Sequence, residues 1–257
     1  MKRAYYLYLI SIIFLTACGE NKHPNDTIPR HYILEIQSKH LAEKRVINIW
    51  TPPAYEQLTD SLPVMYMLDG GISEDFPHIA NTFASLIAQK SIPPMILVGI
   101  ENTERRRDLT GFTEVFEDKK VASAVGGSPK FSAFLQDELF PEINKRYRST
   151  TQKGIMGESI AGLFVIETFL QKPDMFDYYI AFDPSLWWND HYLVKTAKKQ
   201  LATFPNTPKK LWLTASNTEE IAPFVKQLVE ILRTENIPSL KWTFQDEPKE
   251  NHNSIFR

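Results

Sequence analysis

Segment 153–162 constrains the fold more than any other part of the chain. An apolar run ends at Ser159 among small residues, and an apolar helical stretch, 163–170, follows. This order predicts a strand, a sharp turn and a helix, in which the serine is held in a strained conformation at the end of a sheet. Gly157 and Ala161 are small enough for strand and helix to touch there. A plain helix N-cap is the alternative that this stretch alone leaves open.

Composition sets broad limits on the class of protein. The chain has 257 residues, of which 43% are hydrophobic, and this is enough for one large α/β domain. Its net charge is −2, and its basic run, 105–107, is flanked by Glu104 and Asp108. No basic excess points to nucleic acid, so we expect no nucleic-acid partner.

The first residues have the features of a targeting segment. Lys2 and Arg3 precede an apolar run, 5–15, that is too short for a comfortable membrane span. Tetrapeptide 15–18 then resembles the bacterial lipobox, which implies cleavage before Cys18 and lipid on that residue. A secretory signal with an incidental cysteine is the alternative.

The lipobox interpretation predicts the organisation of the whole chain. We expect a signal peptide at 1–17, a polar tether at 18–29 and a single domain at 30–257. Gly19 after the cysteine resembles the outer-membrane sorting pattern. We therefore expect a bacterial cell-envelope protein, anchored to the membrane through lipid on Cys18 and facing the periplasm from the outer membrane. Cys18 is the only cysteine, so no intramolecular disulfide is expected.

Strand-like and helix-like segments alternate along the domain. Two β-rich stretches, 31–38 and 45–50, predict an antiparallel pair at a sheet edge. From Pro63 onward, apolar runs alternate with helical periodicity, which predicts a mostly parallel, doubly wound sheet with helices on both faces. Sites in such sheets lie at the carboxyl ends of the strands. The polar, glycine or aromatic residues that follow predicted strands are Gly70, Gly71, Ser159, Trp187, Trp188, Glu219, Glu220 and His252.

Three of these positions have the residue types of a catalytic set. A serine hydroxyl needs a base to become a nucleophile, and the base needs an anion to orient it. The order Ser159, then Glu219 or Glu220, then His252 is the α/β-hydrolase order of nucleophile, acid and histidine. Counting from the preceding strand favours Glu219, and counting back from the following helix favours Glu220. We choose Glu219 as the acid.

Six motifs in this order resemble a known family. The chain is similar, from about His31 to its end, to the putative-esterase family of α/β hydrolases, which includes esterase D and ferric enterobactin esterase. The matching motifs are 64–70, 96–100 with 107–110, 134–147, 157–164, 184–188 and 250–254.

The resemblance implies an α/β-hydrolase fold and a serine esterase that acts through an acyl-enzyme. Ser159 would be the nucleophile and His252 the base. The oxyanion donors would be the N–H of Ile160 and an N–H at Gly70 or Gly71. Some siderophore esterases of this family work with a Ser–His pair alone, so a dyad also remains open.

Three features depart from the family pattern. Ala161 replaces the usual glycine, and Asp183 stands where the family usually has serine, which adds a charge near the cleft. The sequence given ends five residues after His252, where relatives continue into a closing helix, so we expect the domain to lack that helix.

The expected substrate is a small-molecule ester. The resemblance allows ferric catechol siderophore triesters, acylated carbohydrates and small thioesters. The charged loop and the tryptophan pair predict substrate contacts from Arg107, Asp108, Trp187 and Trp188.

Two other kinds of function remain as alternatives. One is a non-catalytic envelope binding protein that keeps the fold, and the other is an acyltransferase of the mycolyl-transferase type. The chain has no Cys cluster, no His-x-x-x-His and no phosphate-binding glycine loop, so no metal or cofactor is expected. The sequence does not predict an oligomeric state.

Overall fold

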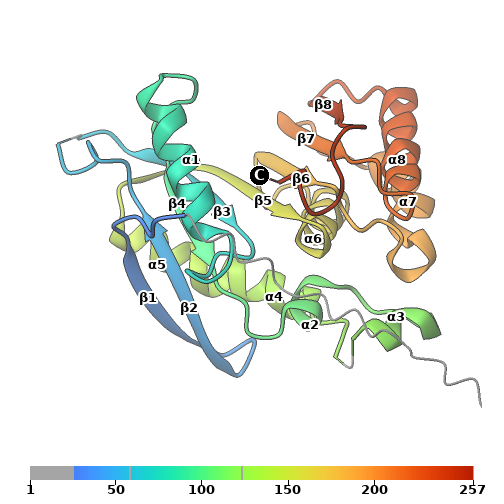
Figure 1. Ribbon diagram of the computed structural model, residues 1–257, viewed down its shortest axis with the longest axis horizontal. Helices are drawn as coiled ribbons and strands as arrows, with labels where there is room; N and C mark the ends of the chain where they lie inside the picture. Colours follow the sequence, from blue (N-terminus) through green and yellow to red (C-terminus); the bar gives the residue numbers. More distant parts are fainter. Residues whose placement is uncertain (1–25, 58, 123, 257) are drawn as a thin grey trace, which may run out of the picture.

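Figure 1 shows a computed structural model of the chain, which describes residues 26–57, 59–122 and 124–256. The predicted signal peptide, Cys18 and most of the tether lie outside these residues. The strands are β1 (Tyr32–Ser38), β2 (Glu43–Trp50), β3 (Leu62–Met67), β4 (Ile96–Ile100), β5 (Ser149–Glu158), β6 (Tyr178–Phe182), β7 (Lys209–Ala215) and β8 (Leu240–Asp246). The helices are α1 (Phe76–Ala88), α2 (Arg105–Leu109), α3 (Phe116–Val121), α4 (Ser128–Phe134), the π-helix η1 (Leu135–Leu139), α5 (Phe140–Arg146), α6 (Ile160–Gln171), α7 (Trp188–Leu201) and α8 (Ala222–Glu235).

The strands of the described chain form one sheet in the order β1-β2-β4-β3-β5-β6-β7-β8. β1 and β2 are antiparallel, as are β2 and β4, whereas every later pair of neighbours is parallel. The prediction of a mostly parallel sheet with antiparallel strands at its N-terminal edge is confirmed. Parallel neighbours end at one edge of a sheet, so the turns after β3, β5, β6 and β7 lie close together.

Both faces of the sheet carry buried helices. On β3, Val64 and Tyr66 belong to the large core that includes α6, whereas Met65 and Met67 pack with α1 on the other face. This alternation follows from the period of two along a strand. The doubly wound arrangement that the sequence predicts is therefore present.

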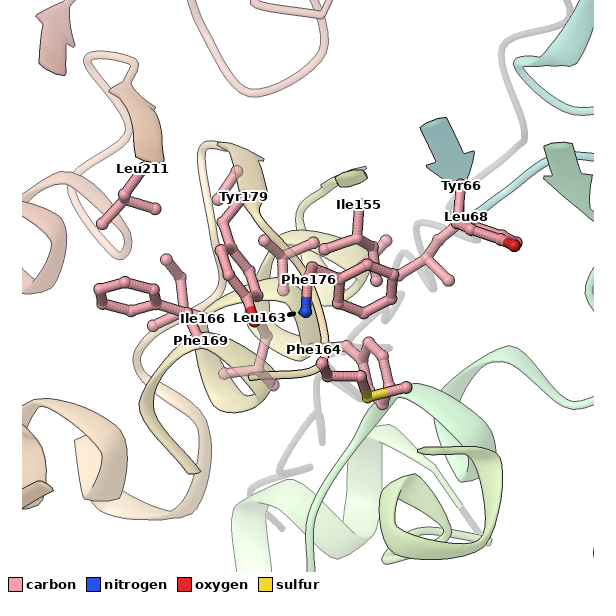
Figure 2. Close-up of a cluster of buried hydrophobic side chains, with 14 of the residues drawn as sticks. Tyr66, Leu68, Ile155, Leu163, Phe164, Ile166, Phe169, Phe176, Tyr179 and Leu211 are labelled. Carbon is pink, nitrogen blue, oxygen red and sulfur yellow. Dashed lines mark hydrogen bonds between the residues drawn. The ribbon is translucent and has the colours of Figure 1, made fainter. Parts of the chain in front are cut away.

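Helix α6 is apolar nearly all round and lies in the centre of the larger core. Figure 2 shows its side chains Phe164 and Phe169 among aromatic and aliphatic residues of the neighbouring strands, including Ile155 of β5 and Tyr179 of β6. All four of these side chains are fully buried. Truncating a buried phenylalanine typically costs about 3–5 kcal/mol, so this packing fixes α6 against β5.

The segment that follows β8 is tied to the strand ends by several contacts. Asn217 donates its N–H to the carbonyl of Glu250 at 2.9 Å, and His252 donates its N–H to the Thr218 hydroxyl at 3.1 Å. The ring of Phe256 lies 4.8 Å from that of Phe182, in an edge-to-face arrangement. These contacts position the loop that carries His252.

A buried ion network joins β2 to α2. The Arg45 guanidinium donates to Asp108 at 2.5 Å, and the two side chains are only 1% and 2% exposed. Arg107 donates to Asp108 at 2.7 Å and to Glu43 at 2.7 Å. The predicted substrate contact of Asp108 is wrong, because its carboxylate is buried between two arginines. The guanidinium of Arg107 is also engaged by carboxylates of its own chain, but it is partly exposed, and its contact with substrate stays a prediction.

We expect Asp108→Ala to lower the free energy of unfolding by about 3 kcal/mol, because it leaves the Arg45 charge buried without this partner. Urea denaturation measures this change. The exposed residue Asp137 provides the control, and Asp137→Ala should change stability by less than about 0.5 kcal/mol. A variant of Asp108 that keeps wild-type stability but raises the KM for an ester would restore the substrate role.

Candidate active site

Ser159 lies at the sharp turn between β5 and α6. Its backbone has φ 59° and ψ −120°, a conformation that a non-glycine residue rarely adopts. A Cβ added to Gly157 would lie 2.7 Å from the Cβ of Ala161, so the strand needs glycine here if the helix carries alanine. The predicted strand, turn and helix are thus present, and the methyl group of Ala161 is accommodated.

The side chain of Ser159 makes no capping hydrogen bond to α6. Its Oγ instead lies 2.9 Å from Nε2 of His252, and Nδ1 of His252 lies 2.7 Å from Oδ2 of Asp183. With the Nδ1 proton donated to Asp183, Nε2 is free to accept the serine proton. The three side chains therefore have the connectivity of a nucleophile, a base and an orienting acid.

The acid in contact with His252 is Asp183, and the prediction of Glu219, with Glu220 as runner-up, is wrong on this point. β6 pairs directly with β5, so the turn after β6 carries Asp183 to the side of Ser159. Glu219 and Glu220 follow β7 and are exposed. A Ser–His pair without an acid is not what the structure shows.

The end of β7 contributes a donor to this carboxylate. Ser216 donates its N–H to Oδ1 of Asp183 at 2.8 Å and its hydroxyl to Oδ2 at 2.7 Å. Together with His252, these donors satisfy a side chain that is fully buried. The sequence signal for Asp183 was its departure from the usual serine of the family motif.

The two N–H groups predicted as oxyanion donors after β3, those of Gly70 and Gly71, have different acceptors: one is a backbone carbonyl and the other is a side chain. The N–H of Gly70 is donated to the carbonyl of Ile100 at 2.9 Å, so Gly70 is not a candidate donor. The N–H of Gly71 is donated to Oε2 of Glu74 at 2.6 Å. Ile160 is the first residue of α6, where an N–H has no acceptor within the helix. Ile160 and Gly71 remain the candidate donors.

An arginine that the sequence did not single out joins the β3 turn to the serine turn. Arg105 donates to both carboxylate oxygens of Asp69, at 2.6 and 2.7 Å, and to the carbonyl of Glu158 at 3.3 Å. Asp69 itself has φ 55°, so the turn after β3 is also strained. The sequence favoured Arg107 because of its place in the family motif, but Arg105 is the member of the run that reaches this edge.

The tryptophan pair is mostly structural. Trp188 is 4% exposed, and its indole N–H donates to the carbonyl of Gly111 at 3.2 Å. Its predicted contact with substrate is therefore wrong. Trp187 is half-buried with its ring 5.8 Å from that of Trp188, and its contact with substrate stays a prediction.

A family model described as Putative esterase matches residues 38–253. The chain belongs to this family. The esterase is 28% identical over 211 residues to the ferri-bacillibactin esterase BesA of Bacillus subtilis, covering 76% of this chain and 72% of that protein. It is 27% identical over 155 residues to an apo-salmochelin esterase of Escherichia coli, covering 55% of this chain and 48% of that protein.

Solved structures give the same picture of the fold. An IroE-like serine hydrolase from Shewanella oneidensis superposes with a TM-score of 0.80 at 25% identity, covering 88% of this chain and 76% of that chain. The siderophore hydrolase EstB of Aspergillus nidulans superposes with a TM-score of 0.75 at 18% identity, covering 91% of this chain and 93% of that chain. The α/β-hydrolase fold is confirmed, and the protein is a carboxylic ester hydrolase.

The described part of the esterase carries neither a membrane-spanning helix nor a metal-binding cluster. Across residues 26–256 without 58 and 123, no helix is both long and apolar enough to cross a bilayer. In the same residues, no three His, Cys, Asp or Glu side chains are grouped so that they could hold a metal ion.

Electrostatics at the site favour a charged Asp183–His252 pair. Burial disfavours the ionised form of Asp183, but hydrogen bonds from His252 and Ser216 hold the pKa of its carboxyl below the ordinary value. Burial also disfavours the imidazolium of His252, but the hydrogen bond to Asp183 and the nearby carboxylate of Glu158 raise its pKa above 6.5. Burial, with Asp75 and Asp69 nearby, raises the pKa of Glu158 to about 7.

We expect Asp183→Asn to lower kcat/KM of the esterase by about 10³- to 10⁴-fold, because His252 loses the acceptor that fixes its tautomer. Hydrolysis of p-nitrophenyl butyrate at pH 8 measures this loss, and a thermal melt checks that the variant is folded. The matched controls, Glu219→Ala and Glu220→Ala, should stay within about twofold of wild type, because both side chains are exposed. A large loss in either glutamate variant, with little loss in Asp183→Asn, would reverse the assignment.

The pH profile follows from the same pair. Neutral His252 is the base, so kcat/KM falls as the pH drops through the pKa of His252. Because this pKa is raised, we expect the acidic limb of the profile to lie above pH 6.5. Glu158→Gln removes one of the charges that raise it and should shift the limb to lower pH, whereas Glu142→Gln on α5 should leave it in place. A limb that does not move in Glu158→Gln would show that Glu158 does not act on His252.

Proposed function

We propose that the esterase hydrolyses siderophore esters through an acyl-enzyme formed on Ser159. The observation that carries the mechanism is the chain of hydrogen bonds from Ser159 through His252 to the buried carboxylate of Asp183, at 2.9 and 2.7 Å. The substrate class is supported by the similarity to the ferri-bacillibactin esterase, which extends over 72% of that protein.

Each step of the reaction has a group in place. Oγ of Ser159 attacks the ester carbonyl while Nε2 of His252 takes its proton, and the negative charge passes to the carbonyl oxygen. Asp183 remains ionised and stabilises the imidazolium through Nδ1. The N–H groups of Ile160 and Gly71 would stabilise the oxyanion, and one such donor is typically worth about 3 kcal/mol.

Collapse of the tetrahedral intermediate breaks the bond to the alcohol. His252 donates its proton to the leaving oxygen, which leaves an acyl group on Ser159. Water then attacks this ester with His252 as base, and a second collapse releases the carboxylic acid and restores the serine hydroxyl. The net reaction consumes one water for each ester bond.

The proposed location is the bacterial cell envelope, with the esterase anchored through lipid on Cys18. The support is the charged start, the short apolar run and the lipobox-like tetrapeptide at 15–18. A periplasmic esterase on such an anchor would meet siderophores that have crossed the outer membrane.

We expect a fluorophosphonate probe to label the wild-type esterase and not Ser159→Ala, because only an activated serine reacts with it. Ser185 is the matched control, since its Oγ lies 3.3 Å from that of Ser159. Ser185→Ala should still be labelled. Absence of labelling in folded wild-type protein would contradict a serine hydrolase.

The substrate class is tested with a panel of enterobactin-like triesters, acetylated and feruloylated sugars and p-nitrophenyl esters. The proposal expects the siderophore triesters to have the highest kcat/KM. Faster turnover of the acylated sugars would assign the esterase to carbohydrate esters instead.

A further inference from the structure

The N–H of Gly71 is covered by a side chain of its own loop. Glu74 accepts it through Oε2 at 2.6 Å, while the N–H of Glu74 is donated back to the carbonyl of Gly71 at 3.0 Å. The other carboxylate oxygen of Glu74 accepts the side-chain amide of Asn102 at 2.8 Å. Glu74 is therefore held in place from two sides.

Strand pairing brings the turn of this covered donor and the turn of the nucleophile to the same edge of the sheet, after adjacent strands. Met67 on β3 pairs with Met156 on β5, and the N–H of Leu68 continues the ladder to the carbonyl of Met156 at 3.1 Å. Three residues after Met156 comes Ser159, and three after Leu68 comes Gly71. Paired strands lie about 4.8 Å apart, so the turns that carry Gly71 and Ser159 leave adjacent strands at one edge of the sheet. Arg105 joins these two turns, because it donates to the carboxylate of Asp69 and to the carbonyl of Glu158.

The contact has a clear physical reason in the free protein. Gly71 is buried, and a buried N–H without an acceptor costs about 1–3 kcal/mol. Glu74 removes this cost while the site is empty of substrate. The ionised carboxylate is not favourably placed, however, because burial and the neighbouring Asp69 raise the pKa of Glu74 above its ordinary value.

We propose that Glu74 is a positioning residue that occupies the oxyanion donor of Gly71 until the carbonyl oxygen of a substrate displaces it. The inference rests on ester hydrolysis at Ser159 and goes beyond the choice of substrate. A small ester that binds only through its reacting group gains little binding free energy when its carbonyl oxygen replaces the Glu74 carboxylate at Gly71. A large ester makes additional contacts away from the reacting group, and their binding free energy can offset the loss of the Glu74 hydrogen bond. Glu74 thus makes the esterase selective against small esters.

The test compares Glu74→Ala with Glu74→Gln on p-nitrophenyl acetate. Alanine frees the N–H of Gly71, so kcat should rise by about tenfold while KM changes by less than about twofold. The neutral amide of glutamine still accepts the N–H but more weakly, so its kcat should rise by about threefold only. A boronic acid, whose tetrahedral adduct on Ser159 places an oxygen in the same position, should bind about tenfold more tightly to Glu74→Ala.

Glu101 provides the matched control. A Cβ added to Gly71 would meet Cγ of Glu101 at 2.9 Å, so this carboxylate is also near the turn, but Glu74 is the side chain that accepts the N–H. Glu101→Ala should leave kcat unchanged. If Glu101→Ala, Glu74→Gln and Glu74→Ala all raise kcat equally, the effect is the loss of negative charge and the proposal is overturned.

Two other outcomes would also overturn it. Lower kcat in Glu74→Ala at an unchanged melting temperature would show that Glu74 supports the turn rather than covering its donor. If Glu74→Ala does not fold, Glu74→Gln retains the shape of the side chain, and boronate binding no tighter than in wild type would contradict the proposal. Labelling of Ser159 by the fluorophosphonate probe tests the proposed nucleophile separately, so the two failures are distinguishable.

Discussion

The packing of α6 against β5 is the constraint on which the site depends. The helix is buried nearly all round, so it has no freedom to move away from the sheet, and the chain must turn within one residue to enter it. Ser159 takes up this turn at φ 59°. The strain costs about 1–3 kcal/mol, a cost that the buried contacts of Phe164 and Phe169 exceed. The position of the serine hydroxyl at the end of β5, half-buried and beside His252, is therefore a consequence of core packing.

The same logic extends to the neighbouring strands. Asp69 after β3 and Asp183 after β6 also have positive φ, at 55° and 42°. Each strand ends within the buried sheet, and the abrupt reversal of each chain directs a short polar side chain along the edge. Asp69 is held by Arg105, and Asp183 by Ser216 and His252. The three adjacent strands β3, β5 and β6 are thus each followed by a residue with positive φ. These residues are Asp69, which Arg105 holds, the nucleophile Ser159 and the acid Asp183.

Much of this could be predicted from the sequence, because the signals were local. The apolar run before Ser159, the small residues around it and the position of His252 after the last strand are all contiguous patterns. The layers of the fold follow from the alternation of strands and helices in the same way. The order of nucleophile, acid and histidine also holds, with Asp183 in the middle place.

The wrong predictions concern contacts between residues that are distant in the sequence, which local sequence patterns do not specify. Glu219 was chosen by its distance along the chain from β7, whereas Asp183 reaches His252 because β6 lies beside β5. Gly70 and Gly71 are equivalent in the sequence, but the carbonyl of Ile100 takes the N–H of Gly70. The contact of Arg105 with Asp69 was also missed, because nothing local in the basic run separates Arg105 from Arg107, which pairs with Glu43.

The polar groups at this edge share one further property, which bears on how a substrate binds. The carboxylate of Asp183, the imidazole of His252 and the N–H of Gly71 each have a partner within the chain. At Gly71, the proposed displacement of Glu74 exchanges one hydrogen bond for another, so its net gain is smaller than that of filling an unsatisfied donor. Such an exchange raises the reaction rate only if the hydrogen bond from Gly71 to the reacting oxygen is stronger than the hydrogen bond from Gly71 to Glu74. The oxyanion of the transition state carries more charge than the carbonyl oxygen of the ester, so the proposed exchange at Gly71 would favour the transition state over the bound substrate.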